Sequence, residues 1–253
     1  MNRPQVSWPA SPVRPTLAHG EVHVWCVALA DVGPELAGTL SPAERDRAAR
    51  LRFEADRRRY LASHGALRAI LGGYLGVEPG AVSYAFTELG KPSLASGGPA
   101  FNLAHAGDLA LVAVSLMPEV GVDLEPDRPI ANLEAIGDRF VSDTEQRRLQ
   151  SLQPAQRARA ILECWTRWEA YLKARGLGVA GLDDAGARDV WPGGPTADGE
   201  LIRTDLAPWV LYHLTPAPNY VGAVAVPGRA TLRTFSWAPS VAIAPPVGRP
   251  SLR

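Results

Sequence analysis

The sequence predicts a mixed α+β fold made of two similar halves, each a small, mainly antiparallel sheet packed against a long helix. Apolar, β-branched segments of strand length alternate with helical sequence along the chain. Their order, which is strand, helix, strand, strand, occurs twice. A duplicated fold of this kind would place a ligand cleft between its two halves.

The first half is delimited by clear local signals. Its strand, helical region and two further strands fall at 22–29, 41–76, 81–87 and 109–116. The helical region begins with a capping box of Ser41 and Glu44, and Pro42 occupies the first helical position. One face of this region is marked at helical spacing by Tyr60, His64, Leu67, Leu71 and Tyr74. A Gly- and Pro-rich loop separates the two later strands.

The second half repeats this order of elements. Its strand, helix and two further strands fall at 120–126, 158–175, 209–214 and 220–226. Gly176 follows the helix, as is typical of helix C-termini. We therefore expect an N-terminal half at 21–117 and a C-terminal half at 118–227. The Pro-rich ends, 1–20 and 228–253, lack periodicity and are expected to be tails.

The composition indicates a soluble, cytoplasmic protein of one or two domains. The chain has 253 residues, of which 46% are hydrophobic, enough for a sizeable core. Basic and acidic residues both number 26, so we expect no binding to nucleic acid or to an anionic membrane. The two cysteines, Cys26 and Cys164, exclude a disulfide framework and a Cys-rich zinc site. The sequence shows neither a signal-peptide core nor an apolar run of membrane-spanning length.

The segment GVDLEP at 121–126 brings two carboxylates together. Strand periodicity places Val122 and Leu124 on one face and Asp123 and Glu125 on the other. Oxygen ligands two residues apart on a strand suit Mg²⁺, which takes one or two carboxylates and leaves its other positions to water and substrate phosphate. An edge strand with an acidic, solvated outer face would show the same short pattern.

The helix at 158–175 offers a third carboxylate. Its expected buried stripe consists of Ile161, Cys164, Trp165, Trp168, Tyr171 and Leu172. Thr166, Glu169 and Lys173 lie along the margin of this stripe, where side chains can face a cleft. Glu169 and Lys173 also have the favourable i,i+4 spacing, so a simple surface ion pair is the alternative.

Basic side chains and one histidine are candidate anion ligands. The segment FNLAHAG at 101–107 places Asn102 and His105 in a loop of small residues, although His105 could equally be a satisfied structural histidine. The Arg-rich segment 45–59 is most simply a solvated helical face, with phosphate binding as its functional alternative. Among the 26 basic residues only Lys91 and Lys173 are lysines, a pattern that favours a compact ammonium at these positions, with chance as the alternative.

Taken in order, these segments resemble the Sfp-type 4′-phosphopantetheinyl transferase family. The resemblance is carried by GKP at 90–92, FNLAHAG at 101–107, GVDLE at 121–125 and WTRWEAYLKARGLG at 165–178. LSPAERDRAARLRF at 40–53 and RFVSDTE at 139–145 are also similar to that family, and Glu145 falls where the family often has an active-site glutamate. Glu145 also forms a predicted capping box with Ser142.

The resemblance implies two pseudo-symmetric α+β halves with coenzyme A and Mg²⁺ in the cleft between them. It implies transfer of the 4′-phosphopantetheine arm of coenzyme A to a serine of an apo acyl or peptidyl carrier protein, with release of 3′,5′-ADP. The carrier would belong to fatty-acid, polyketide or peptide assembly, including secondary metabolite biosynthesis. We expect the protein to act as a monomer.

The resemblance also implies a role for each candidate residue. Asp123, Glu125 and Glu169 would hold Mg²⁺ against the coenzyme A pyrophosphate. Lys173 would reach the same pyrophosphate and would be catalytic together with Glu169. The nucleotide and its 3′-phosphate would be bound by His105, Lys91, Arg47 and Arg59.

Three positions depart from the family pattern. Trp168 stands where the family has a lysine, so proton removal would pass to a carboxylate such as Glu169 or to a water molecule. Ala104 and Ala106 stand where the family has hydroxyl side chains. These departures leave two alternatives open: a coenzyme A-binding or recruited scaffold with a different or lost activity, and a protein that docks carrier domains without chemistry.

Overall fold

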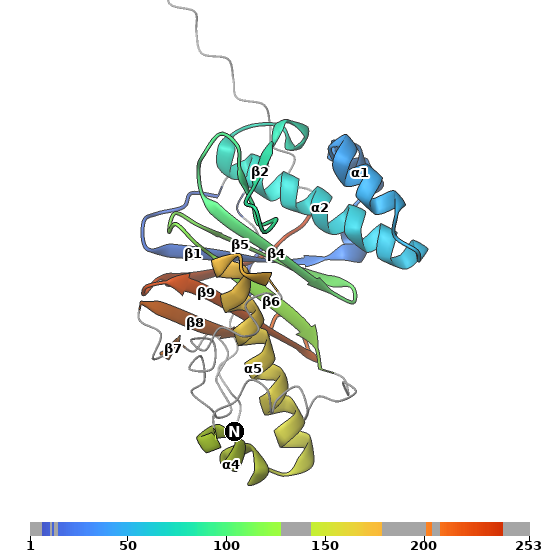
Figure 1. Cartoon of the computed structure of the whole chain (residues 1–253). Coiled ribbons are helices and arrows are strands. Elements are labelled where there is room, and N and C mark those ends of the chain that lie inside the picture. The colour runs from blue at the N-terminus through green and yellow to red at the C-terminus, as the bar shows by residue number, and fades with distance from the viewer. Residues whose placement is uncertain are drawn as a thin grey trace, which may run out of the picture.

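Two four-stranded sheets form the centre of the protein, and each carries a long helix on its outer side (Figure 1). The computed structural model describes residues 7–10, 12, 15–127, 143–178, 201–203 and 208–239. The inner faces of the sheets share one apolar cluster, so the layers follow the order helix, sheet, sheet, helix. The fold is therefore mixed α+β, as predicted. A duplication relating the two halves, and the exact boundaries of those halves, stay predictions.

The first sheet has the strand order β10-β1-β5-β4. Its strands are β1 (Glu21–Ala28), β4 (Ala100–Ala106), β5 (Leu109–Ser115) and β10 (Thr231–Ser236). The long helix α2 (Glu54–Leu75) covers its outer face, where Leu67 and Leu71 join a cluster with Trp25. Beside α2 lie helix α1 (Pro42–Ala49), the hairpin of β2 (Tyr84–Phe86) and β3 (Pro92–Leu94), and the 3₁₀ turns Leu29–Asp31, Pro34–Thr39 and Pro79–Ala81.

The second sheet has the strand order β6-β9-β8-β7. Its strands are β6 (Gly121–Pro126), β7 (Leu201–Arg203), β8 (Trp209–Leu214) and β9 (Tyr220–Pro227). Helix α5 (Pro154–Arg175), which follows the short helix α4 (Asp143–Gln150), covers this sheet with Trp168 and Leu172 against Trp209. No helix within the described ranges is long and apolar enough to cross a membrane.

Apolar side chains at alternating strand positions pack together between the two sheets. Every second residue points inward, which brings Val24 and Leu111 of the first sheet against Val122 and Val224 of the second. Asn102 on β4 adds a polar link, because its Oδ1 accepts a hydrogen bond from the backbone N–H of Val122 at 2.9 Å. β4 is an edge strand of the first sheet and β6 is an edge strand of the second. This buried hydrogen bond therefore connects the edges of the two sheets.

The helix ends follow the local sequence signals. Ser41 and Glu44 form the predicted capping box, with the Glu44 carboxylate 2.8 Å from the Ser41 backbone nitrogen. Gly176 follows α5 with a left-handed φ of 69°, a conformation that glycine adopts without strain. The second predicted box cannot be compared, because Ser142 and the Glu145 side chain lie outside the described residues.

Three segments differ from the sequence-based expectations. Residues 101–107 were expected to form a loop but belong largely to strand β4, which joins β5 through a two-residue turn at Gly107 and Asp108. The expected strand at 81–87 is limited to β2 at 84–86. Residues 231–236 were expected to lie in a tail but form β10, which pairs in parallel with β1. This last error arose because a strand that pairs with the opposite end of the chain needs no local periodicity.

Candidate active site

Helix α5 and strand β6 bring an ammonium and a carboxylate into direct contact. Lys173 Nζ donates to Asp123 Oδ1 at 2.5 Å. A Cβ atom at position 121 would lie 2.0 Å from the Ala170 carbonyl oxygen, so Gly121 permits the close approach of helix and strand. Asp123 is 4% exposed and faces the helix. The pattern GVDLEP therefore does form an edge strand, but the side chain of Asp123 is not on a solvated face.

Glu125 and Glu169 complete a group of carboxylates around Lys173. Burial raises the pKa of both glutamates, and the nearby charge of Asp123 raises it further. Burial by itself would lower the pKa of Lys173, but the surrounding carboxylates raise it overall, so its side chain remains an ammonium at neutral pH. The direct ion pair of Lys173 is with Asp123, which sequence spacing within the helix could not show.

The chemistry of these carboxylates fits a hard divalent cation. Asp123 Oδ2 is buried and has no hydrogen-bond partner among the described residues. Mutual repulsion raises the pKa of Glu125 and Glu169 in addition to burial. A cation with oxygen ligands would satisfy the orphaned oxygen and relieve the repulsion. Within the described ranges, no three acidic, His or Cys side chains are already gathered around one metal position, so the fit rests on these two features.

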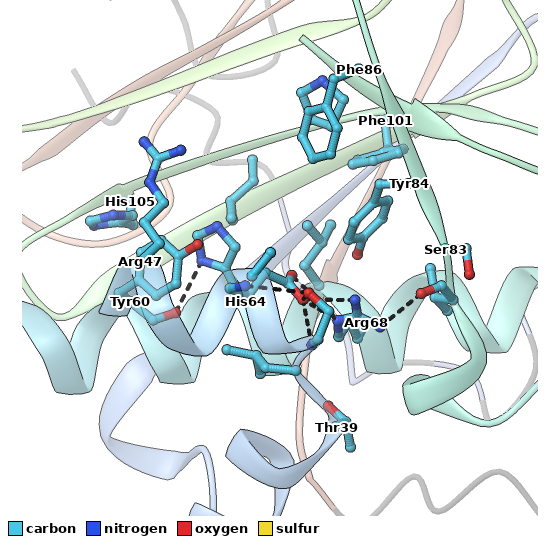
Figure 2. A pocket seen from close by; sticks show the side chains of 18 of the residues that line it. Thr39, Arg47, Tyr60, His64, Arg68, Ser83, Tyr84, Phe86, Phe101 and His105 are labelled. Carbon is cyan, nitrogen blue, oxygen red and sulfur yellow. Dashed lines mark hydrogen bonds and ion pairs between the residues drawn. The ribbon is translucent and has the colours of Figure 1, made fainter. Parts of the chain in front are cut away.

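A cavity of about 1320 Å³ opens next to this group and is bounded by α1, α2, the β2–β3 hairpin and β4 (Figure 2). Arg47, His105 and Lys173 form what we call its basic end. Tyr84, Phe86 and Phe101 form its aromatic end, on the other side of the view in Figure 2. Most of the lining comes from the first half of the chain, so a cleft formed equally by both halves stays a prediction.

Two of the predicted nucleotide ligands, Arg47 and His105, line the cavity. Partial burial lowers the pKa of His105, and the positive charges of Lys173 and Arg59 lower it further. Arg59 itself lines a smaller neighbouring cavity of about 500 Å³, where its Nη2 lies 3.2 Å from Asp108 Oδ1. The structure therefore places Arg47, but not Arg59, at the large cavity.

Lys91 is placed differently from the expectation. Its Nζ donates to the carbonyl oxygen of Ala174 and, at 3.4 Å, to that of Val120. Burial lowers the pKa of this lysine. The ammonium thus caps the negative C-terminal end of α5, whereas Gly90 and Pro92 on either side line the cavity. The ammonium of Lys91 therefore has a structural role, since it binds backbone carbonyl oxygens at the end of α5.

Sequence reasoning did not select the cavity-lining residues Tyr60, His64 and Arg68, although the helical spacing of the first two was recognisable. Arg68 Nη2 lies 2.7 Å from Glu44 Oε2, and Arg68 Nη1 donates to the Val82 carbonyl at 2.8 Å. Because Glu44 belongs to α1 and Arg68 to α2, this buried pair fixes the helix that carries Arg47. Glu and Arg are common in neighbouring helices, so the sequence alone did not predict this ion pair.

The structure also places the three residues that depart from the family pattern, Trp168, Ala104 and Ala106. Trp168 is 1% exposed and packs in the cluster between α5 and the second sheet, as its position in the helical stripe predicted. Ala104 and Ala106 belong to the apolar cluster between the two sheets, and Ala104 also lines the cavity next to His105. Thr166, expected at the margin of α5, is fully buried and donates to the Leu162 carbonyl at 2.7 Å.

A basic cavity beside a group of carboxylates defines a protein suited to a ligand with several phosphate groups. Residues 119–225 match the 4′-phosphopantetheinyl transferase superfamily, and residues 34–117 match the 4′-phosphopantetheinyl transferase N-terminal family. The chain is 41% identical over 243 residues to the 4′-phosphopantetheinyl transferase HetI of Nostoc, covering 93% of this chain and 97% of HetI. This chain belongs to the 4′-phosphopantetheinyl transferase superfamily.

More distant relatives show the same family. The 4′-phosphopantetheinyl transferase AcpT of Escherichia coli strain K12 is 33% identical over 151 residues, which is 59% of this chain and 72% of AcpT. A 4′-phosphopantetheinyl transferase of Bacillus subtilis is 28% identical over 150 residues, which is 57% of this chain and 64% of that protein. The family resemblance seen in the motifs is thereby confirmed.

Proposed function

We propose that the protein transfers the 4′-phosphopantetheine arm of coenzyme A to a serine of an apo acyl or peptidyl carrier protein and releases 3′,5′-ADP. The observation that carries this proposal is the position of Lys173, which lines the basic end of the cavity and also contacts Asp123 of the carboxylate group. A polyphosphorylated ligand in the cavity would therefore have its charge next to the acidic group. The similarity to HetI over nearly the whole chain supports the same activity.

In this reaction the serine oxygen forms a bond to the phosphorus next to the pantetheine arm, and the bond from that phosphorus to the bridging oxygen of the pyrophosphate breaks. Lys173 holds positive charge near the leaving 3′,5′-ADP, and Arg47 and His105 orient the nucleotide phosphates. Glu169, whose pKa is raised by burial, is the carboxylate we assign to accept the serine proton. No covalent enzyme intermediate is required.

Asp123, Glu125 and Glu169 are the residues that would hold Mg²⁺. When bound there, the ion would supply neutralisation of the pyrophosphate charge. With the ion bound, Asp123 Oδ2 would gain the partner that it lacks among the described residues. The chain would act as a cytoplasmic monomer in carrier activation, for example in secondary metabolite biosynthesis.

A second candidate function is a coenzyme A-binding scaffold with a different or lost activity, motivated by Trp168 in place of the family lysine. Trp168 is buried, and its indole packs in the cluster between α5 and the second sheet. This position argues against the idea that the tryptophan reshapes the cavity for another reaction. The three acidic residues are also retained. The burial of Trp168 therefore favours transfer over a scaffold with altered activity, and the retained carboxylates favour transfer over a protein that only docks carriers.

The test of the function is to incubate the protein with coenzyme A, Mg²⁺ and a panel of apo acyl and peptidyl carrier proteins, and then to weigh the carriers. We expect at least one carrier to gain the mass of phosphopantetheine. Omission of Mg²⁺ with a chelator present should abolish the gain. If the protein binds coenzyme A but modifies no carrier, the recruited-scaffold function replaces the transferase.

The two lysines should respond differently to substitution. We expect Lys173→Ala to lower kcat by about 100-fold, since its ammonium neutralises charge that develops in the transition state. Lys91→Ala should instead lower the melting temperature, because it leaves the end of α5 uncapped, and its kcat should fall less than that of Lys173→Ala. Steady-state kinetics and thermal melts of both variants check this. A normal kcat for Lys173→Ala would contradict the assignment.

A further inference from the structure

The imidazole of His64 has a defined hydrogen-bonding pattern. Its Nδ1 lies 3.0 Å from the Tyr60 carbonyl oxygen, and a carbonyl only accepts hydrogen bonds, so Nδ1 carries the proton. Burial lowers the pKa of His64 to about 4, which keeps the ring neutral at physiological pH. In a neutral ring protonated at Nδ1, the other nitrogen, Nε2, is a hydrogen-bond acceptor.

The ring is also held in one orientation. It stacks on the Tyr60 ring with a centroid separation of 3.8 Å and an interplanar angle of 22°. Ser63 Oγ lies 3.3 Å from the same Nδ1. The described side-chain hydrogen bonds of His64 thus all involve Nδ1. The residue also lines the cavity.

His64 occupies the middle of the cavity. Figure 2 shows it on α2 between Tyr60, near the basic end, and Arg68, near the aromatic end. The charged or titratable groups that act on it are Glu44, His105 and Arg47. His64 is therefore a neutral acceptor placed between a phosphate-binding region and an aromatic surface.

The nucleotide of coenzyme A matches this order of surfaces. Its adenine can stack at the aromatic end, and its phosphates can pair with the basic end, which leaves the ribose beside His64. Because the 3′ and 5′ oxygens carry phosphates, the 2′-hydroxyl is the free donor of that sugar. A neutral acceptor at the centre of the cavity is the complement of this hydroxyl.

We propose that His64 Nε2 accepts a hydrogen bond from the ribose 2′-hydroxyl of coenzyme A and thereby makes the enzyme discriminate against 2′-deoxynucleotides. This assignment rests on the proposed function of the cavity. His64 is then a specificity-determining residue that touches the substrate but takes no part in phosphoryl transfer.

The experiment compares binding of adenosine 3′,5′-bisphosphate and of its 2′-deoxy analogue by isothermal titration calorimetry. We expect the wild-type protein to bind the ribonucleotide about three- to tenfold more tightly, the range for one neutral hydrogen bond. In His64→Leu the two ligands should bind equally. In His64→Gln, whose amide oxygen can replace Nε2 as acceptor, part of the discrimination should return. Thermal melts report whether each variant is folded.

Tyr60→Phe is the matched control, because it removes a neighbouring cavity hydroxyl and keeps the aromatic stack. It should retain the wild-type discrimination. Discrimination that survives in a folded His64→Leu, or that disappears in Tyr60→Phe alone, would overturn the assignment of His64. Equal binding of both ligands by the wild-type protein would overturn it and leave the transferase intact, whereas absence of binding by either ligand would overturn the nucleotide cavity as well.

Discussion

We expect Glu169→Gln to lower the rate of phosphopantetheine transfer by about 100-fold or more while leaving the free energy of unfolding unchanged or slightly increased. The loss of rate follows from removal of a proton acceptor and of an oxygen ligand for the cation. The gain in stability follows from the raised pKa of Glu169, which arises from burial and from the charge of Asp123. A carboxylate with a raised pKa destabilises the folded state when ionised at neutral pH, and glutamine removes that charge.

The opposite signs of these two effects distinguish a functional carboxylate from a structural one. Carrier mass over time, measured across a Mg²⁺ titration, gives the rate, and equilibrium urea unfolding gives the stability. Glu54→Gln is the control, because Glu54 is an exposed partner of Arg57 at the start of α2 and should change neither quantity. Full activity of Glu169→Gln, or a loss of rate that only follows a loss of stability, would remove Glu169 from the site.

Asp123 should behave differently from Glu169 on removal. In the structure it is buried against Lys173, so its removal leaves an ammonium without its partner. Glu169→Gln is therefore the cleaner test of the metal site.

The second large effect is expected for Trp168→Lys, which restores the residue of the family pattern. The indole is 1% exposed and lies 5.5 Å from the ring of Trp165, measured between centroids. Loss of its packing and burial of an ammonium should destabilise the protein by about 3–5 kcal/mol. The wild-type protein should already modify a carrier, since this position does not supply its proton acceptor.

Urea unfolding of the variant, together with its carrier-modifying rate, checks this result. Gln156→Lys adds a lysine to an exposed position of the same helix and should leave the stability within about 0.5 kcal/mol of wild type. A stable Trp168→Lys with a higher transfer rate would instead show that the natural protein has moved away from the family reaction. The present packing favours destabilisation.

Local sequence determined the parts of the protein that depend on neighbours along the chain. The capping box at Ser41 and the glycine stop at Gly176 were predictable, because each is completed within a few residues. The alternation that placed Asp123 opposite Val122 was predictable for the same reason. The family motifs further selected the three carboxylates, Asp123, Glu125 and Glu169, whose charges act on Lys173 in the structure.

Tertiary structure alone decided which of these groups meet and what surrounds them. The pairing of β10 with β1, the contact of Lys91 with the end of α5 and the ion pair of Lys173 with Asp123 all join segments distant in sequence. Periodicity defines the faces of one helix or strand but not the surfaces that will cover them, which is why Thr166 was expected at a margin and is buried. The cavity and the neutral state of His64 follow from the same cause, since burial depends on the packing of several elements at once.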